Sequence, residues 1–249
     1  MPKFKDYFST VADSYRNYRP RYPADLFQYL RQISPSGSLA WDCATGNGQA
    51  ATMLAQHFTN VIATDASSEQ IAEAENADNV TYQVATAEST SIGDATVDLT
   101  TVAQALHWFD LPAFVDEVRR VSAPGAALSV WSYAILESTP AVDDVVETLY
   151  NGILGDYWTE ERKLVEDGYA SFELPFAELT CPRFAMHADW TLAKLVGYLS
   201  TWSAGKRYEA QHGVAPLTLV EDDLTAAWGE AERSIRISWP LTVRAWRID

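Results

Sequence analysis

An apolar run that ends in an acid and leads into a glycine-containing turn constrains the fold of this chain most strongly. Residues 39–41 form the run, Asp42 ends it, and a helix is predicted to begin near Gln49. This strand–turn–helix order places Gly46 and Gly48 at the carboxyl end of a parallel strand, where open α/β sheets bind ligands. Glycine lets the backbone turn tightly and lets a ligand approach without meeting a Cβ atom. The segment therefore predicts an α/β fold with a site for a nucleotide-type cofactor.

A second acid follows a second apolar run. Residues 61–64 precede Asp65, which lies seventeen residues after Gly48. A carboxylate at the tip of the second strand can accept both hydroxyl hydrogens of a ribose. We therefore assign Asp65 and the adjacent Ala66 to the same cofactor site.

The turn leaves the type of cofactor open. Gly46, Gly48 and Ala51 match the G-x-G-x-x-A pattern of dinucleotide sites, so an NAD(P)-dependent oxidoreductase is one alternative. Asp42 argues against it, because a negative charge there would face a pyrophosphate poorly and suits a cationic amino group better. The chain also has no downstream Tyr-x-x-x-Lys pair. A non-catalytic protein that binds an adenosyl ligand is a second alternative, since a fold alone does not imply turnover.

The set of motifs resembles the class I S-adenosylmethionine-dependent methyltransferases, whose first motif is an acid followed by alternating glycines. The resemblance covers roughly residues 38 to 135. This segment is similar to the type 11 methyltransferases and to the small-molecule group that includes trans-aconitate methyltransferase. Ala44 stands where the family has its first glycine. The resemblance implies S-adenosylmethionine as cofactor and a small-molecule acceptor. The residues it assigns to the cofactor are Asp42, Ala44, Gly46, Gly48, Asp65, Ala66, Ala87, Glu88 and Gln104.

The expected architecture is a Rossmann-like, doubly wound α/β sheet of seven strands, mostly parallel with an antiparallel last strand, and with a helical cap. We expect one domain over residues 1–249, divided into an N-terminal lid segment (1–37), a cofactor-binding core (38–135), and cap helices with closing strands (136–249). Apolar spacing predicts helices at 23–32, 111–121, 143–154, 160–167 and 191–202. Residues 182–187 and 235–248 are expected to form the antiparallel pair that ends the sheet.

The acceptor side of the site is less defined by the sequence. His107 follows the predicted fourth strand and is the candidate catalytic base; its alternative role is to pack on Trp108 and shape the pocket. Trp108, Tyr15 and Arg19 are the candidate substrate-binding residues, with Tyr15 in the lid and Arg19 placed to recognise an anion. A carboxylate acceptor is ionised near neutral pH and would need no base.

The composition excludes several other kinds of function. With 18 basic and 34 acidic residues the net charge is −16, which opposes binding to nucleic acid and to anionic membrane surfaces. No apolar run approaches the ~20 residues of a membrane span. Two cysteines and no secretory signal predict a cytoplasmic protein. The four histidines lack metal-ligand spacing, so no metal site is expected. The sequence leaves the oligomeric state open.

Overall fold

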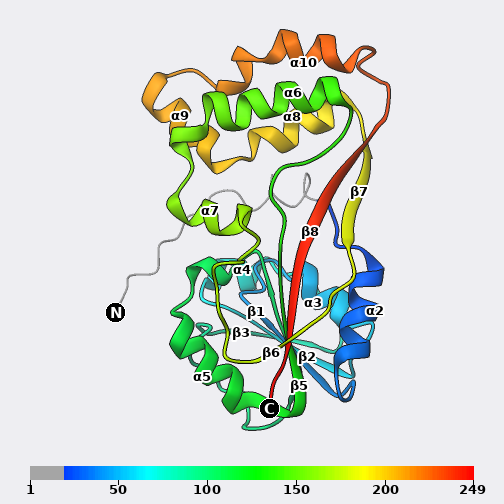
Figure 1. Ribbon diagram of the computed structural model, residues 1–249, viewed down its shortest axis with the longest axis vertical. Helices are drawn as coiled ribbons and strands as arrows, with labels where there is room; N and C mark the ends of the chain where they lie inside the picture. The colour runs from blue at the N-terminus through cyan, green and yellow to red at the C-terminus, as the bar shows by residue number, and fades with distance from the viewer. Residues whose placement is uncertain (1–19) are drawn as a thin grey trace.

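A computed structural model describes residues 20–249, and its centre is a sheet with strand order β3-β2-β1-β4-β5-β8-β6 (Figure 1). Five of these strands run parallel: β1 (Leu39–Cys43), β2 (Asn60–Asp65), β3 (Val80–Val84), β4 (Val97–Ala103) and β5 (Ser122–Ser132). The long last strand β8 (Ile235–Arg247) runs antiparallel to β5 and also pairs with the short edge strand β6 (Ala177–Leu179). The predicted mixed sheet with a reversed last strand is confirmed.

The closing strands differ in detail from the expectation. The two predicted segments do pair, since β7 (Phe184–Trp190) lies antiparallel to the Ile235–Leu241 part of β8. This pairing lies beyond the main sheet, as an eighth strand. The edge of the main sheet is instead β6, which the sequence analysis missed because it has only three residues and none is buried. β8 thus links two parts of the molecule: its first half carries β7, and its second half completes the sheet.

Successive side chains of the buried strands point to opposite faces of the sheet, and they contribute to two hydrophobic layers, one on each face. On β1, Ala40 joins the layer that contains α2 (Ala24–Ile33) and α3 (Gln49–Leu54), whereas Trp41 joins the layer on the other side. That second layer contains α5 (Leu111–Val121). Because strands of parallel sheets are covered on both faces, their side chains are apolar in both directions. The arrangement is the expected doubly wound one.

Local sequence explains where the best-predicted helix starts and ends. Asp110 is the N-cap of α5, and its Oδ1 accepts a hydrogen bond from the Ala113 N–H (3.4 Å). Pro112 lies in the first turn, where a missing N–H costs nothing. Phe114 and Val118 recur at helical spacing and are fully buried. The short α4 (Ser68–Ala72) is capped in the same way, by Ser67.

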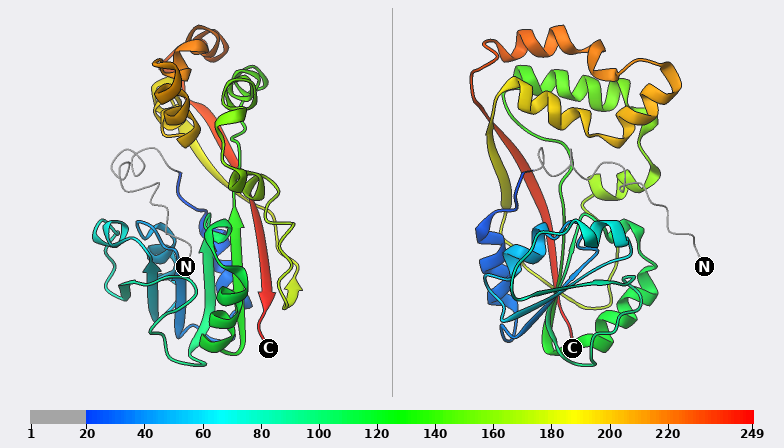
Figure 2. Two further views of the ribbon diagram at one scale, coloured as in Figure 1. Left: turned by 90° about the vertical axis from the view of Figure 1, so that its left-hand side faces the viewer. Right: turned by 180° about the vertical axis from the view of Figure 1, so that it is seen from behind.

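A helical cap lies above the carboxyl ends of the parallel strands (Figure 1). Figure 2 shows that β7 and β8 run together from the cap down to the core. The predicted helix at 143–154 is α6, which begins earlier and continues as the π-helix η2, and the helices at 160–167 and 191–202 are α7 and α8. The elements of the cap are α6 (Pro140–Glu147), η2 (Thr148–Ile153), η3 (Gly155–Tyr157), α7 (Glu160–Glu166), α8 (Leu192–Ser200), α9 (Ser203–His212), η4 (Pro216–Leu219) and α10 (Glu221–Trp228).

The described part of the expected lid segment is α2 and the residues before it. Tyr22 and Phe27 pack edge-on against Trp131, with ring centroids 5.4 and 6.3 Å away. The Gln49 side chain donates a hydrogen bond from Nε2 to the Pro20 carbonyl oxygen (3.1 Å). The first residues that the structure describes therefore lie beside the turn that follows β1.

Candidate functional site

The turn after β1 is built from residues in the left-handed backbone region. Ala44 has φ 55°, Gly46 has φ 56° and Gly48 has φ 83°. A Cβ atom built on Gly46 would meet only the Gln70 Oε1 at 3.8 Å, so the space over this glycine is open. Ala44 adopts the same region at a cost of about 1–2 kcal/mol, because its Cβ crowds the following carbonyl oxygen. The turn is thus held in a tight, open shape despite the missing first glycine.

Gly48 is needed for a different reason. It is the N-cap of α3, and a Cβ atom there would lie 2.2 Å from the hydroxyl oxygen of Tyr82. That hydroxyl donates a hydrogen bond to the Glu75 carbonyl oxygen (2.5 Å), and the Glu75 N–H in turn donates to the Asn47 carbonyl (2.9 Å). The absent side chain lets β3 and the segment after α4 pack directly against the turn.

Asp42 is an ionisable group with almost no exposure, at 1%. Its Oδ2 accepts a hydrogen bond from the Thr45 hydroxyl (2.5 Å), and its Oδ1 accepts one from the Thr101 hydroxyl (2.8 Å). Burial, together with repulsion from Asp65, raises the pKa of this carboxyl to about 6. No basic side chain among residues 20–249 forms an ion pair with it. The turn therefore encloses a negative charge that its own residues only partly compensate.

Asp65 connects the tip of β2 to the turn after β1. Its Oδ2 accepts a hydrogen bond from the Gly46 N–H (2.8 Å), and its Oδ1 accepts one from the Ser67 N–H (2.9 Å). Burial raises the pKa of the Asp65 carboxyl. Each carboxylate oxygen keeps a further acceptor position. The N-cap of α4 is Ser67 and not Asp65, and the half-buried Ala66 lies between the two.

The tips of β3 and β4 supply the other predicted cofactor residues. Ala87 is buried, and the Glu88 Oε1 accepts a hydrogen bond from the Asp110 N–H at the start of α5 (3.1 Å). Gln104 has φ 58°, and its Nε2 donates to the Tyr133 carbonyl oxygen (2.9 Å) beyond the end of β5. Val84, in register with Asp65 and 57% exposed, is an apolar surface at this edge that the sequence analysis missed.

His107 lies in the short helix η1 (Leu106–Trp108) that follows β4. Its Nδ1 and the Tyr169 hydroxyl are hydrogen-bonded at 2.9 Å, and its ring lies 4.6 Å from that of Trp108, which is 39% exposed. Burial, together with the positive charge of Arg162, lowers the pKa of His107 to about 4. The imidazole is therefore neutral at physiological pH. Neither Tyr169 nor Arg162 was a sequence-predicted site residue.

Two of the predicted substrate residues, Tyr15 and Arg19, lie outside the described residues. Among residues 20–249 there is no cluster of three or more His, Cys, Asp or Glu side chains placed to hold a metal ion. In the same range no helix combines the length and the apolar character needed to cross a membrane.

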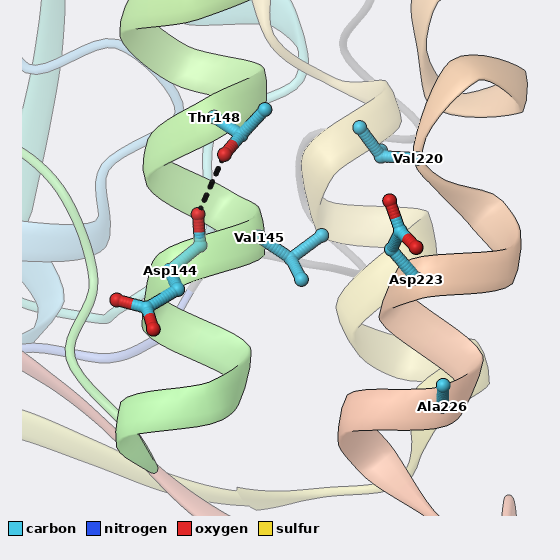
Figure 3. Close-up of a pocket in the computed structure, with 6 residues that line it drawn as sticks. All are labelled: Asp144, Val145, Thr148, Val220, Asp223 and Ala226. Carbon is cyan, nitrogen blue, oxygen red and sulfur yellow. Dashed lines mark hydrogen bonds between the residues drawn. The ribbon is translucent and has the colours of Figure 1, made fainter.

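A separate depression of about 270 Å³ lies in the cap between α6 and α10 (Figure 3). No predicted site residue borders it. The residues that line it are Asp144, Val145, Thr148, Val220, Asp223 and Ala226. The hydroxyl of Thr148, the first residue of η2, donates to the Asp144 carbonyl oxygen of α6 (2.9 Å), so this hydroxyl is already hydrogen-bonded.

Known proteins resemble the chain over most of its length. A family model described as a methyltransferase domain matches residues 41–130. A protein of Dictyostelium discoideum named as a methyltransferase is 37% identical over 205 residues, which are 81% of this chain and 78% of that protein. The chain belongs to the S-adenosylmethionine-dependent methyltransferases.

Two further relatives agree with this assignment. A solved structure of a type II methyltransferase from Anaeromyxobacter dehalogenans is 43% identical, covers 92% of this chain and 98% of its own, and superposes with a TM-score of 0.89. The methyltransferase cfoB of Aspergillus candidus is 25% identical over 202 residues, which are 70% of this chain and 63% of that protein. The family assignment excludes the oxidoreductase alternative.

The structure of this methyltransferase gathers several predicted residues, with two that were not predicted, into two groups. The turn group contains Asp42, Gly46 and Asp65: the Gly46 N–H donates a hydrogen bond to Asp65 of β2, and Asp42 accepts one from the Thr101 hydroxyl of β4. The acceptor-side group consists of His107, Trp108, Tyr169 and Arg162, which come from η1 and from α7 and the residues after it. The family model covers all of the first group, but it ends before Tyr169 and Arg162.

Proposed function

We propose that this methyltransferase transfers the methyl group of S-adenosylmethionine to a carboxylate oxygen of a small-molecule acceptor. The observation that carries the proposal is the link between Asp65 and Gly46, which joins the tips of β2 and β1 around an open turn (2.8 Å). Ligands of open α/β sheets bind at this edge.

The two carboxylates at the turn fit an adenosyl ligand that carries an ammonium group. The Asp65 oxygens retain acceptor positions for the two ribose hydroxyls. Asp42 is almost fully buried, so it acts through its charge and by holding Thr45 in place, more than by open contact. A cationic amino group near the turn would offset that buried negative charge. Gly46 and Ala44 leave the backbone accessible to the methionine part.

The remaining predicted residues fit the adenosine part. Ala66 follows the ribose acid, and Ala87 and Glu88 lie at the tip of β3, with Glu88 fixed by the Asp110 N–H. The exposed Val84 provides an apolar surface suited to a flat ring. Gln104 closes this edge at the end of β4.

The chemistry of the transfer depends mainly on positioning. When bound, S-adenosylmethionine supplies an electrophilic methyl group on a sulfonium sulfur. The chain's part is to hold the acceptor oxygen in line with that group and to exclude water, which can lower a barrier by on the order of 7–11 kcal/mol. The cap over the carboxyl edge of the sheet is placed to do this (Figure 1).

The state of His107 supports a carboxylate acceptor. With a pKa of about 4, its imidazole is a weak base and gives little driving force for removing a proton from an alcohol or a phenol. A carboxylate is already ionised at neutral pH and needs no such step. The net charge of −16 disfavours a polyanionic acceptor such as nucleic acid, which supports a small molecule.

The cofactor part is tested by calorimetric titration of the purified protein with S-adenosylhomocysteine and, in parallel, NADH. We expect Asp65→Ala to weaken S-adenosylhomocysteine binding by about 10- to 100-fold, because it removes charge-assisted hydrogen bonds. Asp98→Ala is a matched control: this carboxylate accepts hydrogen bonds from the Ser38 N–H (2.9 Å) and the Leu39 N–H (3.1 Å) at the opposite edge of the sheet.

The control should lose stability but retain its ligand affinity within about twofold, since it keeps the turn intact. Equal affinity in the wild type and Asp65→Ala would contradict the ribose assignment. Tight binding of S-adenosylhomocysteine without methyl transfer to any acid of a broad panel would contradict the carboxylate acceptor, and without transfer to any acceptor at all would point to a non-catalytic adenosyl-binding protein.

A further inference from the structure

Arg162 is a cation of the cap that lies next to the acceptor-side group. It is part of α7, which packs against η1, the helix that carries His107 and Trp108. Its side chain is 22% exposed. The positive charge acts on both His107 and Tyr169, which are themselves hydrogen-bonded to each other. Arg162 therefore lies beside His107 and Tyr169, where the cap meets the segment that follows β4.

The guanidinium of Arg162 is held in one orientation by aromatic rings. Its central carbon lies 5.5 Å from the centre of the Tyr150 ring and 5.2 Å from the centre of the Trp158 ring. Its Nε donates a hydrogen bond to the Tyr150 hydroxyl (2.6 Å). A guanidinium fixed by ring contacts loses little further freedom when it forms new hydrogen bonds. The arrangement is thus pre-organised.

The hydrogen-bonding capacity of Arg162 is only partly used. The nearest carboxylate, that of Glu166, lies 3.6 Å from Nε and is itself hydrogen-bonded by the Tyr150 hydroxyl. Neither terminal nitrogen of Arg162 forms a hydrogen bond with any residue in the range 20–249. Two N–H-bearing nitrogens in a fixed plane match the two oxygens of a carboxylate.

We infer that Arg162 is the specificity-determining residue of the acceptor site, where its terminal nitrogens bind a carboxylate of the methyl acceptor. This inference rests on the proposed function, and it assigns the recognition of the acid to a residue of α7. The competing explanation is that Arg162 only fastens α7 to η2 through Tyr150. The two explanations differ in what a substitution does to acid binding.

The test is a titration of protein saturated with S-adenosylhomocysteine. The probes are three acids (benzoate, succinate and tricarballylate), each paired with its neutral amide. We expect the wild type to bind at least one acid and to bind its amide much more weakly. Arg162→Gln should weaken acid binding by about 10- to 100-fold, and Arg162→Lys should give an intermediate loss, because lysine keeps the charge but not the planar fork.

Arg119→Gln is the matched control. This guanidinium also stacks on an aromatic ring, with its carbon 5.2 Å from the centre of the Phe176 ring, and has a loose pair with Asp116 at 3.7 Å. It lies on α5 and should leave acid binding unchanged. S-adenosylhomocysteine affinity should also be unchanged in Arg162→Gln and Arg162→Lys, which shows that both variants are folded.

Three results would overturn the role of Arg162: acid binding in Arg162→Gln or Arg162→Lys equal to that of the wild type, amides bound as tightly as acids, or no acid bound at millimolar concentration by wild type loaded with S-adenosylhomocysteine. A wild type that fails to bind S-adenosylhomocysteine would instead overturn the proposed function. The two failures are therefore distinguished in one experiment.

Discussion

Asp42→Asn is the substitution that best tests how the site and the stability of the fold are connected. Asparagine has nearly the same shape as aspartate but carries no charge. The hydroxyls of Thr45 and Thr101 now donate to the two carboxylate oxygens. With asparagine, one hydroxyl can still donate to the amide oxygen, and the other can rotate to accept from the amide NH₂ group. The variant thus removes the buried charge while keeping both hydrogen-bond partners.

The expected effect follows from the raised pKa. Burial moves the Asp42 carboxyl from its ordinary value of 3.8 to about 6, a difference of about two pH units. At 1.36 kcal/mol per unit this corresponds to a cost of roughly 3 kcal/mol once the group is ionised. Because the folded pKa is above the unfolded one, the cost is absent below about pH 4, develops between pH 4 and pH 6, and is complete above pH 6. Asp42→Asn should then raise stability near pH 8 by about 1–3 kcal/mol, allowing for one weaker hydrogen bond.

The assay is urea unfolding of the wild type and Asp42→Asn without ligand, at several pH values from about 4 to 8. Subtracting the two free energies of unfolding removes the contribution of the titrating groups that do not interact with Asp42. The difference in free energy of unfolding should be largest near pH 8 and approach zero near pH 4. A variant less stable than the wild type near pH 8, or a difference that does not change with pH, would refute the reasoning. Calorimetry should also show weaker S-adenosylhomocysteine binding in Asp42→Asn.

Two other substitutions test the turn and the acceptor side. Gly48→Ala should lower the free energy of unfolding by about 2–3 kcal/mol, because its Cβ would displace the Tyr82 hydroxyl and its backbone would be strained; an unchanged urea midpoint would contradict this. His107→Gln should reduce methyl transfer to a carboxylic acid by less than about tenfold, with a flat rate between about pH 6 and pH 8, since no base is required. A loss of a hundredfold or more in a radiolabelled transfer assay would show that His107 acts as the base.

The core was predictable because its sequence signals are local. An apolar run, an acid and a glycine turn mark the ends of β1, and α5 is marked by Asp110 at its start and an apolar stripe along its length. Three cap helices, α6, α7 and α8, were also predicted from their apolar spacing, but other cap elements lack such signals. Helix α9 buries only Ala204 of its ten residues, so no apolar period reveals it. The three-residue β6 exists because β8 offers a partner, which no local pattern encodes.

Some residues of the candidate site were also predictable from local sequence, and others were not. Asp42 and Asp65 were found because each lies at the carboxyl end of a predicted buried strand, and parallel strands bring their carboxyl ends to one edge. Tyr169 and Arg162 lie some sixty residues after His107 and belong to no motif. They reach the site because α7 packs on η1 and the chain then turns at Gly168, which has φ 62°. Only the tertiary fold determines that neighbourhood.

Residues with unfavourable backbone conformation or buried charge are concentrated at the carboxyl edge of the sheet. Three of the four non-glycine residues with positive φ among residues 20–249 are Ala44, Gln104 and Tyr169, and each lies in the turn, at the tip of β4 or in the acceptor-side group. Such conformations cost of order 1–3 kcal/mol each and persist where the surroundings over-determine them. The buried charge of Asp42 adds a cost of similar size. A ligand that brings a cation to the turn would relieve that charge, and its binding would stabilise the fold by mass action. The carboxyl edge of the sheet is thus less stable by itself than the rest of the core, which is what a site built for its ligand requires.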